Sequence, residues 1–266
     1  MADLTLSQIW IYPIKSLGGI SLQTAKVMPK GLEFDRRWML VDSNGQFLTQ
    51  RIHSKMALFK PSLADGQLSI NYKEHSIAFS TDEALDGAFT AQIWDDTVSV
   101  TEVNKDLNEW FSEHLGINCQ LVRFPEKNER RVDPGYAPTE EHVSLADAYP
   151  FLIIGQSSMD DLNKRLPQPL SIKRFRPNFV FTGGEPYEED YWQNFTIGST
   201  QFIGVKRCSR CPLPTVDPET GEKGVEPLRT LSTFRKIDNK VCFGQNLLAI
   251  DHTKINVGDR ITLKTS

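Results

Sequence analysis

Short β-rich runs separated by turn residues fill the first hundred positions and leave few folds open to this chain. Ser43-Asn44-Gly45 and residues 64–67 each separate two such runs, and residues 93–100 contain a third turn between strands. Residues 4–12 alternate and are rich in β-formers, which predicts an opening strand. Short strands separated by frequent turns are typical of a small β-barrel or sandwich. We therefore expect a barrel-like unit in this part of the chain.

The periodicity of the sequence changes after this region. Asn104 can cap a helix over residues 105–115, and Gly116 can end it. Further runs predict strands at 119–124, 151–154, 179–181, 195–202, 241–249 and 255–263, and short helices at 157–165 and 227–234. The expected fold class is mixed and mainly β (α+β), with a few short helices.

A polar, charged stretch covers residues 125–141 and includes Asp133-Pro134-Gly135. It is typical of a loop between structural units, and it predicts two domains, residues 1–124 and 125–266. The same stretch could serve as a lid over an active site, and the sequence leaves both alternatives open.

The composition is that of an ordinary globular protein, with 39% hydrophobic and 24% charged residues among 266. A net charge of -4 argues against a general nucleic-acid binder. No run approaches the roughly 18 apolar residues of a membrane span, and the first residues lack a signal-peptide pattern. Only four cysteines occur, without the spacing of a disulfide framework, so we expect a reducing, cytoplasmic location.

Residues 206–221 carry the strongest chemical signal. Cys208 and Cys211 lie among three basic residues, and a cation beside a thiol stabilises the thiolate, the form that binds soft metals. Pro212 and Pro214 exclude a helix, so Cys211 should lie on an irregular loop. We interpret this loop as presenting one functional thiolate, and Cys211 is the preferred candidate.

Three alternatives stay open from the residues alone. The two cysteines could form a thioredoxin-like redox pair, although such pairs usually open a helix. They could form half of a zinc site, which needs four ligands, but no second CxxC or close histidine pair is present. They could also be inert loop cysteines.

The stretch Cys208-Ser209-Arg210-Cys211, followed by Thr215-Val216-Asp217-Pro218 and Gly221, resembles the signature of MOSC-domain proteins. It is most similar to that of the molybdenum-cofactor enzymes of the amidoxime-reducing type and their bacterial relatives. The resemblance implies an N-terminal β-barrel domain packed on a MOSC β-barrel, with Cys211 as the molybdenum ligand. Pro214 departs from the pattern, because the animal enzymes carry Thr there.

Further matches run nearly end to end and imply a set of site residues. Asp147 would be a catalytic residue beside the metal, where it would orient the substrate or shuttle protons. The resemblance assigns the cofactor to Lys15, Ser16, Arg36, Ala148, Tyr149, Arg176, Asn178, Ser209, Arg210 and Asn246. Taken without the resemblance, these residues have simpler explanations.

Lys15 could be a solvated charge at a strand end. Arg36 could pair with Asp35 or another surface carboxylate, and Asp147 could satisfy turn amides. Arg176 could pair with Glu185, Glu188 or Glu189. For Arg51 we expect only a contribution to the positive charge at the rim of the site.

The resemblance implies a detoxifying oxidoreductase that reduces N-hydroxylated bases, amidoximes or hydroxylamines. No cysteines remain for an iron–sulfur cluster, so electrons should come from a separate flavin reductase, ferredoxin or cytochrome-type haem protein. We expect a monomer without nucleic-acid or membrane partners. Two alternatives remain: a cofactor or sulfur carrier without turnover, and a zinc or redox-thiol protein.

Overall fold

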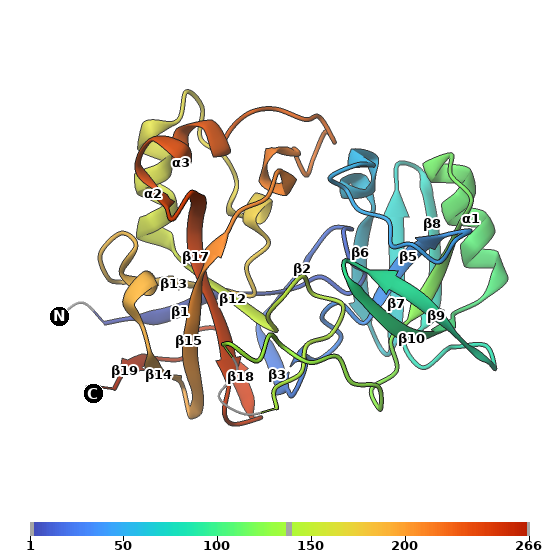
Figure 1. Ribbon diagram of the computed structural model, residues 1–266, viewed down its shortest axis with the longest axis horizontal. Helices are drawn as coiled ribbons and strands as arrows, with labels where there is room; N and C mark the ends of the chain where they lie inside the picture. Colours follow the sequence, from blue (N-terminus) through green and yellow to red (C-terminus); the bar gives the residue numbers. More distant parts are fainter. Residues whose placement is uncertain (1–2, 137–139, 265–266) are drawn as a thin grey trace.

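The chain forms two lobes that lie side by side in the computed structural model, which describes residues 3–136 and 140–264 (Figure 1). Strands predominate in both lobes, so the predicted mixed, mainly β fold is confirmed. Within the described residues, no helix is both long and apolar enough to cross a membrane.

The larger lobe is built on a nine-stranded sheet with the order β19-β14-β15-β17-β12-β13-β1-β2, in which β16 also pairs with β17. Its strands are β1 (Thr5–Ile11), β2 (Ile20–Leu22), β12 (Phe151–Gly155), β13 (Phe179–Thr182), β14 (Asn194–Ile197), β15 (Thr200–Ser209), β16 (Lys236–Ile237), β17 (Lys240–Ala249) and β19 (Ile261–Leu263). A small sheet of β18 (Lys254–Asn256), β3 (Thr24–Met28) and β4 (Gly31–Leu32) packs against the same apolar core. That core is rich in phenylalanine. Strands β12 and β13 are nearly continuous apolar runs in the sequence because their residues are buried on both faces of the sheet.

Strands from the start of the chain belong to this large sheet. Strand β1 runs antiparallel to β13, with Leu6 opposite Phe181, and β2 pairs with β1. Strand β3 pairs with β18 near the end of the chain. The domain boundary between residues 124 and 125 stays a prediction, and the structure places the first strands in one sheet with strands beyond that boundary.

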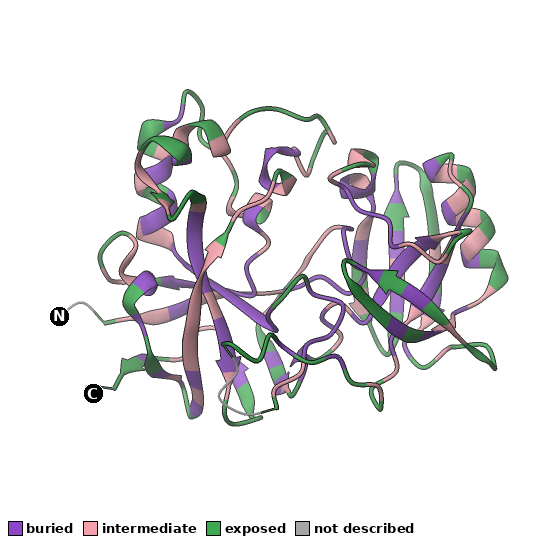
Figure 2. Ribbon diagram, in the orientation of Figure 1, coloured by how far each residue is buried: buried purple, intermediate pink, exposed green. Residues whose placement is uncertain are grey.

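The smaller lobe holds two sheets around a second core. One contains β5 (Trp38–Asp42), β11 (Cys119–Arg123), β10 (Asp96–Glu102) and β9 (Ala88–Ile93), and the other contains β6 (Lys60–Ala64), β7 (Gln67–Tyr72) and β8 (His75–Ser80). Trp38, Phe59 and Phe111 are buried between them. Figure 2 shows the alternation of buried and exposed residues along β9 and β10, as expected for a sheet with one face in water.

Two of the three predicted hairpins are confirmed. Ala64 pairs with Gln67 across the β6–β7 turn, and Ile93 pairs with Asp96 across the β9–β10 turn. The third is only partly right. The chain does turn at Gly45, but the following run makes only an isolated bridge to β5, whose full-length partner is β11.

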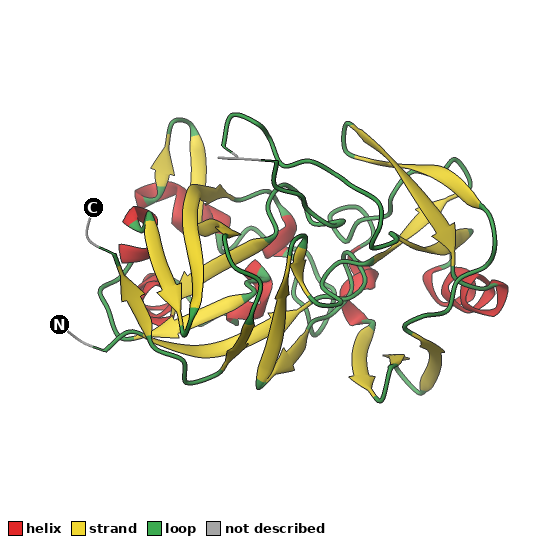
Figure 3. Ribbon diagram, turned by 90° about the horizontal axis from the view of Figure 1, so that it is seen from below, coloured by secondary structure: helices red, strands yellow, loops and turns green. Residues whose placement is uncertain are grey.

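The predicted helices are present and lie on the outside of the sheets (Figure 3). Helix α1 (Lys105–Leu115) is capped by Asn104, whose side chain accepts from the Leu107 N–H at 2.8 Å, and it ends at Gly116 in the left-handed conformation. Helices α2 (Gln156–Arg165) and α3 (Leu228–Phe234) cover the larger lobe. Short 3-10 turns occupy Ser54–Leu58, Ile172–Phe175, Glu188–Tyr191 and Leu213–Thr215.

The stretch expected to be a boundary loop or a lid is only partly described, because residues 137–139 lie outside the described residues. Its earlier part is not uniformly exposed, since Arg130 and Val132 are buried. Its role as a lid stays a prediction.

Candidate functional site

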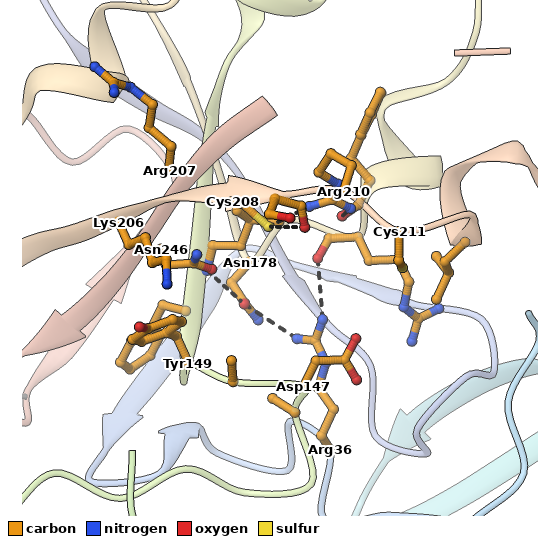
Figure 4. Close-up of a pocket in the computed structure, with 18 of the residues that line it drawn as sticks. Arg36, Asp147, Tyr149, Asn178, Lys206, Arg207, Cys208, Arg210, Cys211 and Asn246 are labelled. Carbon is orange, nitrogen blue, oxygen red and sulfur yellow. Dashed lines mark hydrogen bonds between the residues drawn. The ribbon is translucent and has the colours of Figure 1, made fainter. Parts of the chain in front are cut away.

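A cavity of about 350 Å³ is lined by residues from both lobes (Figure 4). The structure brings every site residue predicted from the sequence to its wall: Lys15, Ser16, Arg36, Asp147, Ala148, Tyr149, Arg176, Asn178, Ser209, Arg210, Cys211 and Asn246. Most come from the loop before β12, from the end of β15 and its following loop, and from β17. Their individual roles remain predictions, but their proximity is a property of the fold.

Cys211 lies just beyond β15, on an irregular segment before the 3-10 turn Leu213–Thr215, as the prolines predicted. Its thiol is partly exposed to the cavity and is not in a disulfide. The Arg51 Nε donates to Cys211 Sγ at 3.0 Å. Arg51 therefore contributes more than a basic rim, because it contacts the predicted ligand directly.

A second thiol lines the same cavity. Cys208, at the end of β15, accepts a hydrogen bond from Arg210 Nη1 at 2.9 Å. Each of the two cavity cysteines thus has its own arginine. Among residues 3–136 and 140–264, no three or more His, Cys, Asp or Glu side chains gather in a way that could hold a metal, so the zinc alternative finds no ligand set there.

Asp147 joins the two lobes through three donors. Lys15 Nζ lies 2.6 Å from its Oδ1, Arg51 Nη2 lies 2.5 Å from its Oδ2, and Trp94 Nε1 donates to Oδ1 at 3.2 Å. Burial would raise the pKa of this carboxyl, but Lys15 and Arg51 outweigh burial and hold it well below its usual range. Asp147 is therefore an ionised acceptor at neutral pH, although half of its side chain is exposed.

Lys15 is nearly enclosed, with only 5% of its side chain exposed, so it is not the solvated charge of the simpler alternative. It also donates to the Leu145 carbonyl at 2.8 Å. Burial lowers the pKa of Lys15 to about 8, against the opposing effect of Asp147. Ser16 beside it adopts the left-handed backbone conformation, with φ of 67°.

Arg36 and Arg176 approach the ring of Tyr12, with their guanidinium carbons 4.4 and 4.1 Å from its centroid. Both arginines have positive φ, which non-glycine residues rarely adopt and which often marks functional sites. Arg36 pairs with Asp35 at 2.5 Å, as the simpler alternative predicted, and it lines the cavity as well.

Arg176 makes none of the predicted glutamate pairs. Instead, its Nη1 donates to the Leu17 carbonyl at 2.5 Å. Glu189 accepts from Ser158 and from the Gly155 N–H, and Glu188 accepts from the Glu185 N–H. Burial, followed by the nearby Arg36, lowers the pKa of Arg176 to about 10. Of these two neighbouring guanidinium groups, only Arg36 pairs with a carboxylate among the described residues, and the excess positive charge favours an anion in the adjacent cavity.

The amide of Asn178 is already used within the protein. Its Nδ2 donates to Asp35 Oδ2 at 3.0 Å and to the Trp10 carbonyl at 3.2 Å, while its Oδ1 accepts from the Leu152 N–H and from Arg36. These contacts fix the Asp35–Arg36 pair. This geometry favours a supporting role for Asn178 over direct ligand recognition.

Comparison with known proteins adds to this geometry. A family model described as the MOSC N-terminal beta barrel domain matches residues 3–118, and one described as the MOSC domain matches residues 140–262. The chain belongs to the MOSC-domain family.

Relatives of two kinds match this MOSC protein, amidoxime-reducing components and molybdenum cofactor sulfurases. It is 32% identical to mitochondrial amidoxime-reducing component 1 of Mus musculus, over 97% of this chain and 82% of that protein. It is 31% identical to mitochondrial amidoxime reducing component 2 of Rattus norvegicus, over 89% and 74%. It is also 31% identical to molybdenum cofactor sulfurase of Arabidopsis thaliana, over 96% of this chain but only 35% of that protein.

The cavity of this MOSC protein fits an anionic, sulfur-bearing cofactor. Lys15, Arg36, Arg176 and Arg210 supply positive charge around it, and Cys211 supplies a soft ligand. The Nε of Arg210, a cavity residue, is buried and has no hydrogen-bond partner among the residues that the structure describes. An orphaned donor of this kind suits a site that is completed by an acceptor from a ligand.

Two residues of the site, Lys240 and Trp94, were not predicted from the sequence. Lys240 adds positive charge to the wall, and Trp94 contacts Asp147 from the smaller lobe. Lys206 and Arg207, two of the three basic residues noted around Cys208 and Cys211, also line the wall, although neither was assigned to the site. Only the position of Trp94 carried a further local signal, since a bulky aromatic residue is unusual in a two-residue hairpin turn.

Proposed function

We propose that this protein holds the molybdenum cofactor in the cavity and reduces N-hydroxylated compounds, such as N-hydroxylated bases, amidoximes or hydroxylamines. The observation that carries the proposal is the combination of a thiol, an ionised carboxylate and excess buried guanidinium groups in one cavity. The near full-length similarity to relatives named for amidoxime reduction supports it.

Cys211 would hold the metal, and Lys15, Arg36, Arg176 and Arg210 would hold the anionic part of the cofactor. When bound, the cofactor supplies two-electron reduction of an N–O bond, which consumes two protons and releases water. The protein must therefore bind the substrate beside Cys211, keep it oriented and deliver protons.

The electrostatics favour different roles for two neighbouring residues. Asp147 is ionised and can accept an N–H of the substrate, but it does not hold a proton at neutral pH. Lys15 holds a proton on Nζ, 2.6 Å from Asp147 Oδ1, and its pKa of about 8 suits proton release near neutral pH. We therefore assign substrate orientation to Asp147 and proton supply to Lys15.

The proposed reaction takes its electrons from a separate protein of the flavin, ferredoxin or small haem type.

Two of the four cysteines are buried in the cores, Cys119 in the smaller lobe and Cys242 on β17. Burial raises the pKa of Cys119 to about 11, which suits a packing role.

A carrier function is the second candidate. The match to molybdenum cofactor sulfurases covers almost the whole chain, and Cys208 adds a second thiol to the cavity. A carrier would transfer cofactor or sulfur to an apo-enzyme without reducing a substrate.

Elemental analysis and a reductase assay with an artificial electron donor test the proposal. Protein from a host that makes the cofactor is compared with Cys211→Ser and with the matched control Cys119→Ser. We expect near-stoichiometric molybdenum and amidoxime reduction, lost in Cys211→Ser and kept in Cys119→Ser. Molybdenum without reductase activity, but with transfer to an apo-enzyme, would favour the carrier. Zinc in the wild type would refute both, and no metal at all would refute the reductase and the cofactor carrier.

A further inference from the structure

Trp94 occupies an unusual position. It lies in the two-residue turn between β9 and β10, where its φ of 56° falls in the left-handed region that bulky residues avoid. Despite its size, 41% of the residue is exposed. An aromatic side chain kept in a strained turn and partly in water indicates a role other than core packing.

Trp94 contacts two residues that line the cavity and one other aromatic residue. Its Nε1 donates to Asp147 at 3.2 Å, and the Arg51 guanidinium carbon lies 4.5 Å from its ring centroid. The ring of Phe47 lies 5.0 Å away on a tilted plane. We call Phe47, Trp94 and the Arg51 guanidinium the aromatic platform. Arg51 joins the platform to Cys211 and to Asp147.

The hairpin that carries Trp94 is anchored beside the site. Asp96, two residues along, pairs with Arg130 Nε at 2.7 Å. Arg130 in turn donates to the carbonyls of Ser144 and Ala146 at 2.9 and 2.6 Å, and to that of Asp147 at 3.3 Å. Arg130 is buried, so its bonds to the Ser144 and Ala146 carbonyls are shielded from water, whereas the Asp96 carboxylate is half exposed. The network fixes the turn relative to Asp147 and so presets the position of the indole.

We propose that Trp94, which contacts the cavity residues Asp147 and Arg51, is a specificity-determining residue at the margin of the cavity and favours substrates with a flat conjugated ring next to the N–O group over small aliphatic ones. The inference rests on the proposed reductase function. With the Arg51 guanidinium over one side of the indole, a planar π system can contact the exposed part of the ring in an offset-stacked or edge-to-face arrangement. Because its position is preset, little ordering is needed when a ring binds.

Asp147 completes the recognition. A carboxylate offers about four acceptor positions, and Lys15, Trp94 and Arg51 use three of them. The remaining position, on Oδ2, can accept one N–H of an amidoxime or of its amidine product. A substrate bound there has its reacting group between Asp147 and Cys211, and its substituent lies against the platform.

Benzamidoxime and acetamidoxime test this directly, since they share the reacting group and differ in the ring. Trp94→Leu should lower the benzamidoxime-to-acetamidoxime ratio of kcat/KM about tenfold, mainly through KM. Trp94→Phe should keep the ratio within about threefold, because it preserves an aromatic face. Leu85→Ala is the matched control, an equally exposed apolar residue of the same lobe, and it should leave the ratio unchanged.

Binding of the products separates this inference from the proposed function. Calorimetric titration with benzamidine and acetamidine should show an about tenfold weaker benzamidine Kd in Trp94→Leu, with the acetamidine Kd changed by less than about twofold. Equal losses for both ligands, or no loss, overturn the role of Trp94 even if the enzyme is active. Trp94-dependent benzamidine binding without turnover in any variant overturns the reductase function and supports the platform.

Discussion

Asp147 can be compared with Glu189 and Asp190, which are neighbours in the sequence. In these carboxyl groups, nearby cations and burial set the charge state in different ways. Asp147 is half exposed at the cavity, and two cations keep it ionised. Glu189 is fully buried and receives only neutral donors, Ser158 and the Gly155 N–H. Burial raises the pKa of Glu189 to about 7. Nearby cations, more than depth, therefore decide which carboxyl group is charged.

Asp190 extends the comparison, because it is as deeply buried as its neighbour but paired. Its Oδ2 accepts from Arg207 at 3.0 Å and from Arg235 at 2.5 Å, and only 2% of its side chain is exposed. A paired carboxylate in the interior contributes to stability, whereas the paired carboxylate at the cavity is accessible to a ligand. The following predictions test this difference.

The largest effect is expected from Asp190→Asn. It leaves the largely buried Arg235 without a counter-ion, and we expect the free energy of unfolding to fall by about 3 kcal/mol. Asp147→Asn makes the same chemical change where the carboxylate is half exposed. The Lys15 left without its partner can release its proton, because its pKa is already lowered to about 8, so we expect a cost of about 1 kcal/mol. Urea unfolding at pH 7 measures both. Equal losses of unfolding free energy in the two variants would show that the exposure of the carboxylate does not determine its contribution to stability.

Glu189→Gln should remove a pH dependence of stability. The raised pKa means that the folded state keeps a proton that the unfolded state releases, so wild-type stability falls as pH rises from about 4.5 to 7. The full shift corresponds to about 3 kcal/mol, an upper bound. Unfolding across this range should show the fall in the wild type and in the exposed control Glu185→Gln, but not in Glu189→Gln. A slope that persists in Glu189→Gln would assign it to another group.

In the cofactor-free protein, Lys15→Met should remove a pH dependence of stability that has the opposite sign. The lowered pKa means that folded Lys15 releases its proton while the unfolded chain still holds one, so stability rises between about pH 8 and 10.5. We expect a rise of about 2 kcal/mol, less than the full shift implies because the cavity admits water. Thermal unfolding of the wild type, Lys15→Met and the exposed control Lys26→Met measures it. If Lys15→Met keeps the rise, Lys15 is not the group responsible.

The sequence predicted the local structure well where adjacent residues determine it. Asn104 and Gly116 mark the ends of α1 because a cap and a left-handed stop act within a few residues. The run after Gly45 failed as a full strand, because its backbone is divided between β5, through the Leu48 N–H and the Leu40 carbonyl, and β9, through the Phe47 N–H and the Gln92 carbonyl. The full-length partner of β5 is β11, which follows some 80 residues later. Strand partners that distant carry no local signal.

The site shows the same difference between features set by adjacent residues and contacts between distant residues. The motif around Cys211 and the resemblance it carries identified the residues that line the cavity. They could not reveal that Arg51 touches the Cys211 thiol or that Asn178 is already satisfied, since these contacts span 160 and up to 168 residues. Trp94 escaped notice because its function depends on where its hairpin is anchored, and Arg130 provides that anchor from another segment.

The pairing of β1 with β13 also matters while the chain is being synthesised. Ser7 bonds to the carbonyl of Val180, 173 residues later. At about 5 to 20 residues per second, the ribosome needs roughly 10 to 35 seconds to supply that partner. During this interval β2 is available to pair with the first strand, but β13 is not, and neither half of the gene encodes the complete large sheet. Recombination that exchanged one half for another would have to preserve a strand junction formed by residues from both.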